Sequence, residues 1–113
     1  MSSGTFFELA GAADLQADEM IAVDLPGGLR LAVYNVEGQI YATDDRCTHG
    51  NASLADGDLD GFLVMCPFHD GRFDIRTGCP IALPVSVPIK TYGVEIREGR
   101  IGVVVPSADE ASA

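Results

Sequence analysis

Basic side chains and long apolar runs are both scarce in this sequence, and each scarcity narrows the possible functions. Seven Lys and Arg stand against seventeen Asp and Glu, a formal net charge of −10. This balance disfavours nucleic acid and anionic membrane surfaces, whose phosphates would repel the chain. No stretch approaches the ~20 apolar residues of a membrane-spanning helix, and the N-terminus lacks the basic and apolar segments of a secretory leader. We therefore expect a cytoplasmic protein that binds neither nucleic acid nor membranes.

Cysteine and histidine are also rare, because the 113 residues include only three Cys and two His. Two of the cysteines belong to motifs described below, so no pair remains for a structural disulfide, which fits a reducing compartment. The length suits a single core, and the hydrophobic fraction of 47% argues against disorder. We expect one domain over residues 1–105, a flexible acidic tail over 106–113, and a monomer.

Short apolar stretches separated by turn residues favour an all-β fold, a sandwich or a small barrel, since no segment keeps a helical period. Within one such stretch, Leu31 and Val33 fall on one face and Ala32 and Tyr34 on the other. Residues 44–61 are predicted to form a loop. Three prolines in 79–88 exclude a central strand there and favour an extended loop. The strands are predicted at 5–9, 20–25, 29–36, 40–43, 62–65, 72–75, 90–97 and 101–105. Glu-Gly pairs predict hairpin turns at 37–39 and 98–100.

Two short motifs hold both histidines and two of the three cysteines. The first reads C-T-H at 47–49, the second reads C-P-F-H at 66–69, and sixteen residues separate them. Thiolate sulfur and imidazole nitrogen are ligands for iron–sulfur clusters, zinc and copper. Four such groups on two loops could hold one zinc ion or one two-iron cluster. The candidate metal ligands are Cys47, His49, Cys66 and His69.

The order of the ligands favours the two-iron cluster. Structural zinc sites usually pair close cysteines and then close histidines, whereas each loop here supplies one of each. That arrangement suits two irons with different ligands, both thiolates on one and both imidazoles on the other, as in a Rieske 2Fe–2S centre. Neutral imidazoles leave such a cluster less negative and raise its potential above that of four-cysteine ferredoxins. Seven nearby aspartates act in the opposite direction, so we expect a potential toward the low end of the Rieske range: Asp44, Asp45, Asp56, Asp58, Asp60, Asp70 and Asp74.

The sequence resembles the small Rieske-type ferredoxins of bacterial aromatic-ring-hydroxylating dioxygenase systems, in particular the naphthalene and salicylate branch. The phrases Y-A-T-D at 41–44, G-R-F-D at 71–74 and L-P-V at 83–85 carry the resemblance to the group beyond the ligand motifs, and I-K-T-Y at 89–92 carries the likeness to that branch. The resemblance covers roughly residues 5–105. Rieske proteins of cytochrome bc complexes carry an extra cysteine in each loop. Phe68 occupies that position in the second loop here, which disfavours that branch.

The resemblance implies a Rieske-type β-sandwich with a small cluster-binding subdomain, whose loops lie within 44–85. Cys47 and Cys66 would bind the buried iron, and His49 and His69 the iron nearer solvent. The chain would pass single electrons from an NAD(P)H-dependent flavin reductase to a terminal oxygenase in aromatic hydrocarbon catabolism. Around the cluster, glycines would let backbone amides approach the sulfides, and apolar residues would shield it: Gly50, Pro67, Phe68, Gly71 and Pro84.

The residues also argue that the chain is a carrier and not an enzyme. Both histidines are committed to the cluster, so neither a mononuclear iron site nor a Ser/His/Asp triad can be built, and no G-x-G-x-x-G dinucleotide fingerprint occurs. Two alternatives stay open: a Rieske small subunit of a nitrite reductase, and a zinc-stabilised β-domain acting as a binding module. Cys79 is expected to be a small buried hydrophobe. Asp70 would either lower the potential or face a partner.

Overall fold

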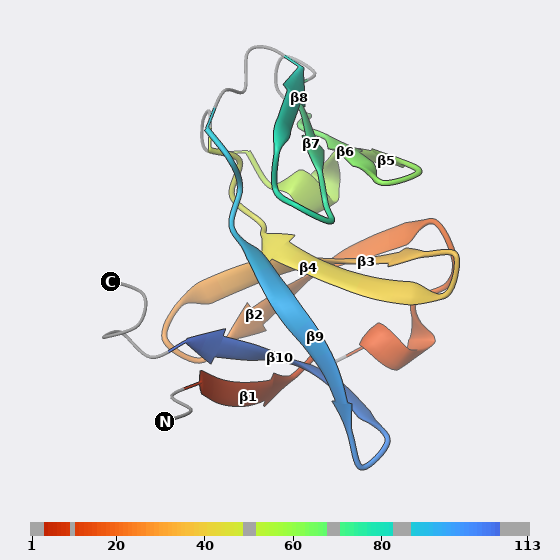
Figure 1. The fold of residues 1–113 in the computed structure, drawn as a ribbon, viewed down its shortest axis with the longest axis vertical. Helices are drawn as coiled ribbons and strands as arrows, with labels where there is room; N and C mark the ends of the chain where they lie inside the picture. Colours follow the sequence, from red (N-terminus) through yellow and green to blue (C-terminus); the bar gives the residue numbers. More distant parts are fainter. Residues whose placement is uncertain (1–3, 10, 49–51, 68–70, 83–86, 107–113) are drawn as a thin grey trace.

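The structure is a computed structural model that describes residues 4–9, 11–48, 52–67, 71–82 and 87–106. Over these residues ten strands form two sheets in which every neighbouring pair is antiparallel, a large sheet in the order β1-β10-β9-β4-β3-β2 and a small sheet in the order β5-β6-β7-β8. Figure 1 shows the large sheet curled on itself, with the small sheet at one end. The strands are β1 (Gly4–Glu8), β2 (Glu19–Leu25), β3 (Leu29–Val36), β4 (Gln39–Asp44), β5 (Asp58–Asp60), β6 (Leu63–Met65), β7 (Arg72–Asp74), β8 (Pro80–Ala82), β9 (Thr91–Arg97) and β10 (Arg100–Pro106).

Tight turns fix the register of the large sheet. Glu37 and Gly38 join β3 to β4 with φ of 54° and 87°, and Glu98 and Gly99 join β9 to β10 with φ of 51° and 79°. Two successive residues with positive φ match the twist of the strands that they connect. Both hairpins were predicted from their Glu-Gly pairs, and the structure confirms them.

Strand β3 is buried on both faces and separates two hydrophobic cores. Leu31 and Val33 pack inside the large sheet, whereas Ala32 and Tyr34 face the small sheet, as the alternation of the sequence predicted. We call the first group the large-sheet core and the second the small-sheet core. The buried members of the small-sheet core are Ala32, Tyr34, Val36, Cys47, Ala52, Leu54, Val64, Cys66, Phe73, Ile75 and Ile89.

The predicted loop 44–61 is partly wrong, because it contains regular structure. A 3-10 helix, η2 (Leu54–Asp56), and the edge strand β5 both lie within it. Strand β5 alternates Asp58, Leu59 and Asp60, and only Leu59 is partly buried. An edge strand of three residues with one apolar side chain gives no periodic signal, since its solvent-facing charges resemble those of a loop. A second 3-10 helix, η1 (Ala12–Asp14), was likewise not predicted.

The predicted extended loop 79–88 is also corrected in part. Its first residues form β8, which pairs with β7 at the edge of the small sheet. Pro80 begins this strand, a position at an edge where the missing N–H breaks no ladder. The exclusion of a central strand is therefore confirmed, whereas the absence of any strand is wrong.

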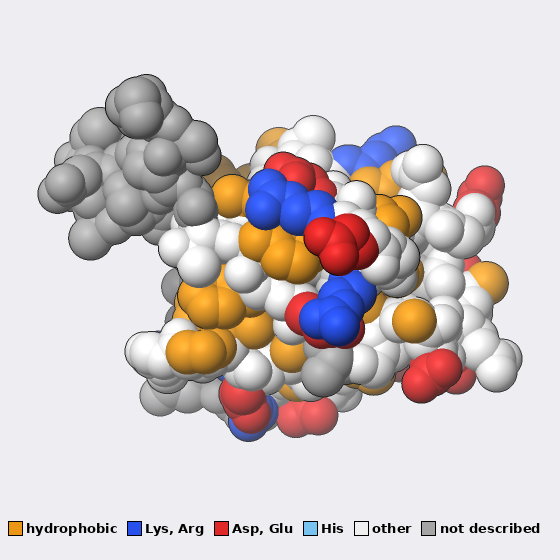
Figure 2. Space-filling model, turned by 90° about the horizontal axis from the view of Figure 1, so that it is seen from below, with side chains coloured by type: hydrophobic (Ala, Val, Ile, Leu, Met, Phe, Trp, Pro, Cys, Tyr) orange, Lys and Arg blue, Asp and Glu red, His pale blue; other side chains and the backbone are white. Residues whose placement is uncertain are grey.

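The end of the large sheet opposite the small sheet carries paired charges over apolar side chains, as Figure 2 shows from below. Arg97 lies 2.9 Å from Glu95, and its guanidinium is 4.6 Å from the centre of the Phe6 ring. Gly102 lies under that ring, where an added Cβ would collide with Phe6 and with the carbonyl of Phe7. These exposed ion pairs add little stability, so we assign the packing here mainly to Phe6 and Gly102.

Strand β10 continues to Pro106, and residues 107–113, most of the predicted flexible tail, lie outside the described residues. Among the described residues the structure contains no helix that is long and apolar enough to span a membrane.

Candidate metal centre

The structure brings the two motif cysteines together in the small-sheet core. Cys47 is 2% exposed and Cys66 is 1% exposed, and neither they nor Cys79 forms a disulfide. The two predicted histidine ligands, His49 and His69, lie outside the described residues. The cysteine half of the predicted ligand set is therefore placed in one buried cluster, and the histidine half remains a prediction.

The two loops have the same length and are closed in the same way. The amide of Cys47 donates to the carbonyl of Ala52 at 2.9 Å, and the amide of Cys66 donates to the carbonyl of Gly71 at 2.7 Å. Each loop thus runs from a cysteine to the fifth residue after it. Antiparallel pairing continues behind each closing bond, through the pairs Arg46–Ser53 and Met65–Arg72. The sequence motifs did not predict that the two loops have equal length, because His is the third residue of one loop and the fourth of the other.

Buried Asp45, two residues before Cys47, is held in a network of hydrogen bonds next to the first loop. It is 2% exposed, and its Oδ1 accepts a hydrogen bond from the amide of Ala55 at 2.9 Å. Its backbone amide donates to the carbonyl of Arg30 at 3.1 Å, and its carbonyl accepts from the amide of Leu54 at 2.7 Å. This carboxylate satisfies a part-buried backbone donor of η2, so Asp45 is a structural residue and not a solvent-exposed charge.

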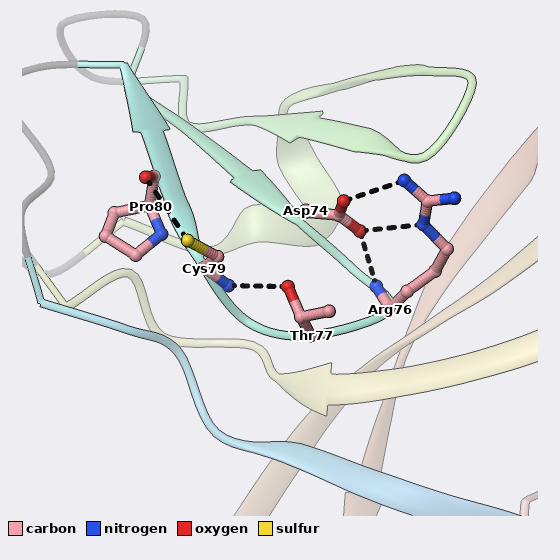
Figure 3. Close-up of polar contacts among 5 residues, drawn as sticks. All are labelled: Asp74, Arg76, Thr77, Cys79 and Pro80. Carbon is pink, nitrogen blue, oxygen red and sulfur yellow. Dashed lines mark hydrogen bonds and ion pairs between the residues drawn. The ribbon is translucent and has the colours of Figure 1, made fainter.

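Two further aspartates near the loops are also engaged. The hydroxyl of Tyr92 donates to Asp44 Oδ1 at 2.6 Å. Asp74 accepts from the Nε, the Nη2 and the backbone amide of Arg76, at 3.0, 2.8 and 2.9 Å (Figure 3). The hydrogen bond from the Arg76 side chain lowers the pKa of Asp74, because the positive partner favours the carboxylate.

Arg76 also links the two sheets through aromatic side chains. Its guanidinium lies 4.1 Å from the centre of the Phe62 ring, and Phe62 meets Tyr41 of β4 edge-on at 5.8 Å with an interplanar angle of 87°. Both geometries are favourable for aromatic groups. The chain Asp74–Arg76–Phe62–Tyr41 therefore braces the small sheet against the large one.

Cys79 is exposed, so the expectation that it is buried is wrong. It follows Gly78 in the turn between β7 and β8, where its amide donates to Thr77 Oγ1 at 3.2 Å and its sulfur lies 3.8 Å from the Pro80 carbonyl (Figure 3). The expectation rested on the general burial of cysteine. The turn reverses the chain at this residue and leaves the side chain outside the small-sheet core.

Of the five residues expected around the cluster, the structure describes two. Gly71 is buried and closes the second loop, and Pro67 is exposed; the shielding role expected of Pro67 stays a prediction. The remaining three, Gly50, Phe68 and Pro84, lie outside the described residues.

Sequence reasoning missed three residues that shape the loops. Gly57 passes so close to β6 that an added Cβ would collide with the Met65 carbonyl, and Gly78 approaches the Ile89 carbonyl in the same way. Thr48 Oγ1 donates to the carbonyl of Val87 at 2.8 Å. A glycine in a loop is too common a signal to identify a close approach, and a contact over 39 residues leaves no mark in a single sequence.

The residues present fit the thiolate half of a two-iron cluster. Two buried cysteine sulfurs in one apolar core, at matching positions of equivalent loops, suit an iron held away from solvent. Each histidine belongs by sequence to the segment between a loop's two closing residues. Among the described residues no group of three or more His, Cys, Asp or Glu side chains comes together.

Comparisons with known proteins agree with this reading. Residues 5–93 match the family model of the Rieske [2Fe–2S] domain. Ferredoxin CarAc of Metapseudomonas resinovorans is 44% identical over 98 residues, which cover 87% of this chain and 92% of that protein. The ferredoxin component of the naphthalene 1,2-dioxygenase system of Pseudomonas putida is 44% identical over 96 residues, covering 85% of this chain and 91% of that protein.

Solved structures give the same result for the fold. The Sphingomonas yanoikuyae B1 ferredoxin is 45% identical with a TM-score of 0.84, covering 90% of this chain and all of that one, 100%. A chain in the complex of reduced oxygenase and oxidised ferredoxin in carbazole 1,9a-dioxygenase is 44% identical with a TM-score of 0.81, covering 87% and 91%. A nitrite reductase small subunit from Mycobacterium tuberculosis has a TM-score of 0.79 at 19% identity, covering 93% and 98%, a likeness of fold alone.

The family model spans most of the chain, and the relatives that are over 40% identical are named as ferredoxins. The predicted all-β Rieske fold, the 2Fe–2S cofactor and the role of carrier are confirmed by these matches. The chain therefore belongs to the Rieske [2Fe–2S] domain family, as a ferredoxin that carries electrons and is not itself a catalytic enzyme.

Proposed function

We propose that this ferredoxin takes single electrons from an NAD(P)H-dependent flavin reductase and delivers them to the terminal oxygenase of an aromatic-ring-hydroxylating dioxygenase system. The Pseudomonas putida relative is named as the ferredoxin component of a naphthalene dioxygenase system, and a solved structure with a chain that is 44% identical is a complex of oxygenase and ferredoxin. Nitrite reductase is not favoured, since the likeness to its small subunit is one of fold. We place the protein in the cytoplasm as a monomer, where a reduced cysteine environment would preserve its thiols.

The proposed ligands are Cys47 and Cys66 for one iron and His49 and His69 for the other. The single observation that carries this assignment is the equivalence of the two loops, each opening at a buried cysteine and closed by the same hydrogen bond. A bound Rieske cluster would supply reversible one-electron transfer.

The protein itself orients the cysteine sulfurs and keeps water away from them. Two rigid loop bases fix the cysteine sulfurs inside the small-sheet core. Phe73 and Val64, both 0% exposed, fill that core beside them and exclude water. The side of the site toward β3 is therefore closed by protein, so electron exchange is expected at the loop ends, where the histidines belong by sequence.

Replacement of each ligand tests the proposal. The purified holoprotein is expected to contain two irons and two acid-labile sulfides per chain and to show the electron paramagnetic resonance signal of a histidine-ligated cluster. Cys47→Ser, Cys66→Ser, His49→Ala and His69→Ala should each abolish that signal. Cys79→Ser serves as the matched control, because Cys79 is exposed and lies outside the small-sheet core. A colourless protein that binds zinc, or a cluster that survives loss of either motif cysteine, would refute the assignment.

The partners are tested separately. Reduced holoprotein should be reoxidised by a ring-hydroxylating oxygenase with its aromatic substrate, and a flavin reductase with NADH or NADPH should reduce it again. If the ferredoxin binds its cluster but exchanges no electrons with any such pair, the ligand assignment stands and the proposed partners are wrong.

A further inference from the structure

Residues 87–90, which we call the strap, lead into β9 and run beside the segment that follows β4 (Figure 1). Hydrogen bonds hold the strap at three points within four residues. The contacts are Thr48 Oγ1 to the Val87 carbonyl at 2.8 Å, the Ile89 amide to the Gly78 carbonyl at 2.9 Å, and the Asp44 amide to the Lys90 carbonyl at 2.9 Å.

Each of these bonds reaches a different part of the molecule. Thr48 belongs to the first ligand loop, between Cys47 and His49 in the sequence. Gly78 belongs to the turn after β7, the strand that begins immediately after the second loop closes. Asp44 ends β4 of the large sheet. The strap therefore connects the first loop, the support of the second loop and the large sheet.

The middle of the strap is fixed tightly. Ile89 is 2% exposed in the small-sheet core, and its carbonyl lies against Gly78, whose φ of +80° and lack of a Cβ allow this approach. The other end is different, because Val87 is 57% exposed. At that end the hydrogen bond from the Thr48 hydroxyl connects the strap to the first loop, outside the small-sheet core.

We propose that Thr48 is a positioning residue for the cluster, whose hydroxyl holds the first ligand loop against the strap and so keeps the two loops at a fixed separation. The inference rests on the proposed ligand set, since Thr48 is adjacent in the chain to Cys47 and next to His49. The closing bond from Cys47 to Ala52 and the pair Arg46–Ser53 secure the base of this loop. The Thr48 bond secures it on the side of the strap, toward a segment 39 residues away.

Thr48→Val removes the hydroxyl and keeps the shape of the side chain, whereas Thr48→Ser keeps the hydroxyl. One neutral hydrogen bond is worth about 1 kcal/mol net, which corresponds to roughly a fivefold change in local opening. Thr48→Val holoprotein should exchange the Ile89 amide about fivefold faster, release iron to a chelator faster by a similar factor, and broaden the cluster's resonance signal. Thr48→Ser should behave as the wild type. Thr5→Val, the same change at an exposed position of β1, is the matched control.

The outcomes are distinguishable. If Thr48→Val matches the wild type in exchange, iron release and line shape, the proposal is overturned. If Thr48→Val fails to fold, or speeds exchange in β2, β3 and β10 as much as in the strap, Thr48 is merely a stabilising residue and the proposal is equally overturned. If the wild type itself lacks the signal of a histidine-ligated cluster, the failure lies in the proposed ligand set and not in the role of Thr48.

Discussion

Single aspartates around the ligand loops have distinct roles, although the sequence presents them as one acidic group. Asp45 is buried and accepts a backbone amide, and Asp74 is paired with Arg76. Asp58, on the edge strand β5, is exposed. Charge alone therefore cannot rank these residues, because hydrogen bonding and burial decide what each one contributes.

Asp45→Ala is expected to destabilise the protein by about 1–3 kcal/mol, since it leaves the part-buried Ala55 amide without its acceptor. Denaturant unfolding of the apoprotein measures this effect apart from the metal. Asp58→Ala is the control and should change the unfolding free energy by no more than about 0.5 kcal/mol. Equal effects of the two substitutions would contradict the structural role of Asp45.

Buried Tyr34 makes stability fall at alkaline pH. Burial raises the pKa of its hydroxyl, which is bonded to Thr43 Oγ1 at 2.8 Å. The folded state thus keeps a proton that the unfolded chain loses above about pH 10, so the stabilisation is complete below that pH and is lost as the pH rises further. The unfolding free energy of Tyr34→Phe should fall less steeply with pH above about 10 than that of the wild type. Parallel curves in a denaturant series at pH 8 to 11 would show that Tyr34 has no part in the loss.

At the scale of elements, close packing of a strand limits what its glycine can become. Gly102→Ala in β10 should destabilise the protein by roughly 1–3 kcal/mol, because the new methyl group would displace the Phe6 ring and crowd the Phe7 carbonyl. Gly93→Ala in the neighbouring strand β9 is the matched control, since nothing lies within 4 Å of an added Cβ there. Thermal unfolding of the two variants provides the measurement, and a lower midpoint for Gly93→Ala than for Gly102→Ala would overturn the packing argument.

The elements that the sequence predicted are those with their own periodic or turn signal. Alternation predicted the two faces of β3, and Glu-Gly pairs predicted the β3–β4 and β9–β10 hairpins. Strands β5 and β8 were missed, because each has three residues at the edge of the small sheet. Edge strands of that length depend on a neighbour for their hydrogen bonds and carry little pattern of their own.

The site shows the same division. The two motifs singled out Cys47 and Cys66 by residue type and spacing, and the structure places both in the small-sheet core; their role as ligands stays a prediction. The strap, the close approach at Gly78 and the burial of Asp45 were not predictable, since each depends on residues brought together by the fold. The burial expected for Cys79 failed for the reverse reason, because a general tendency was applied without a local signal.

At the scale of the whole molecule, the net charge of −10 is expected to lower the redox potential of the cluster. Negative charge opposes addition of an electron, so we predict a midpoint potential toward the low end of the Rieske range of about −150 to +300 mV. A redox titration of the holoprotein measures it. Asp44 and Asp74 should lower the potential less than free carboxylates would, because hydrogen bonds from Tyr92 and Arg76 partly compensate their charges. A potential several hundred millivolts positive would contradict the prediction.

The same charge should govern encounter with the reductase. We expect electron transfer from the reductase to slow as salt is added, because screening weakens attraction between an acidic ferredoxin and a basic docking face. Stopped-flow reduction at several ionic strengths checks this expectation. Replacing the exposed pair Asp58 and Asp60 by Asn should reduce the slope if β5 contributes to the attraction. A rate indifferent to salt would count against electrostatic docking.

Strand β3 contributes side chains to both the large-sheet core and the small-sheet core. Leu31 and Val33 belong to the large-sheet core, and Ala32, Tyr34 and Val36 belong to the small-sheet core, so one strand supports both. A design that transfers the small sheet and its core to another protein must therefore include β3 or replace its side chains. Conversely, a substitution at Leu31, chosen only to stabilise the large-sheet core, is expected also to disturb Ala32, the next residue on the small-sheet side.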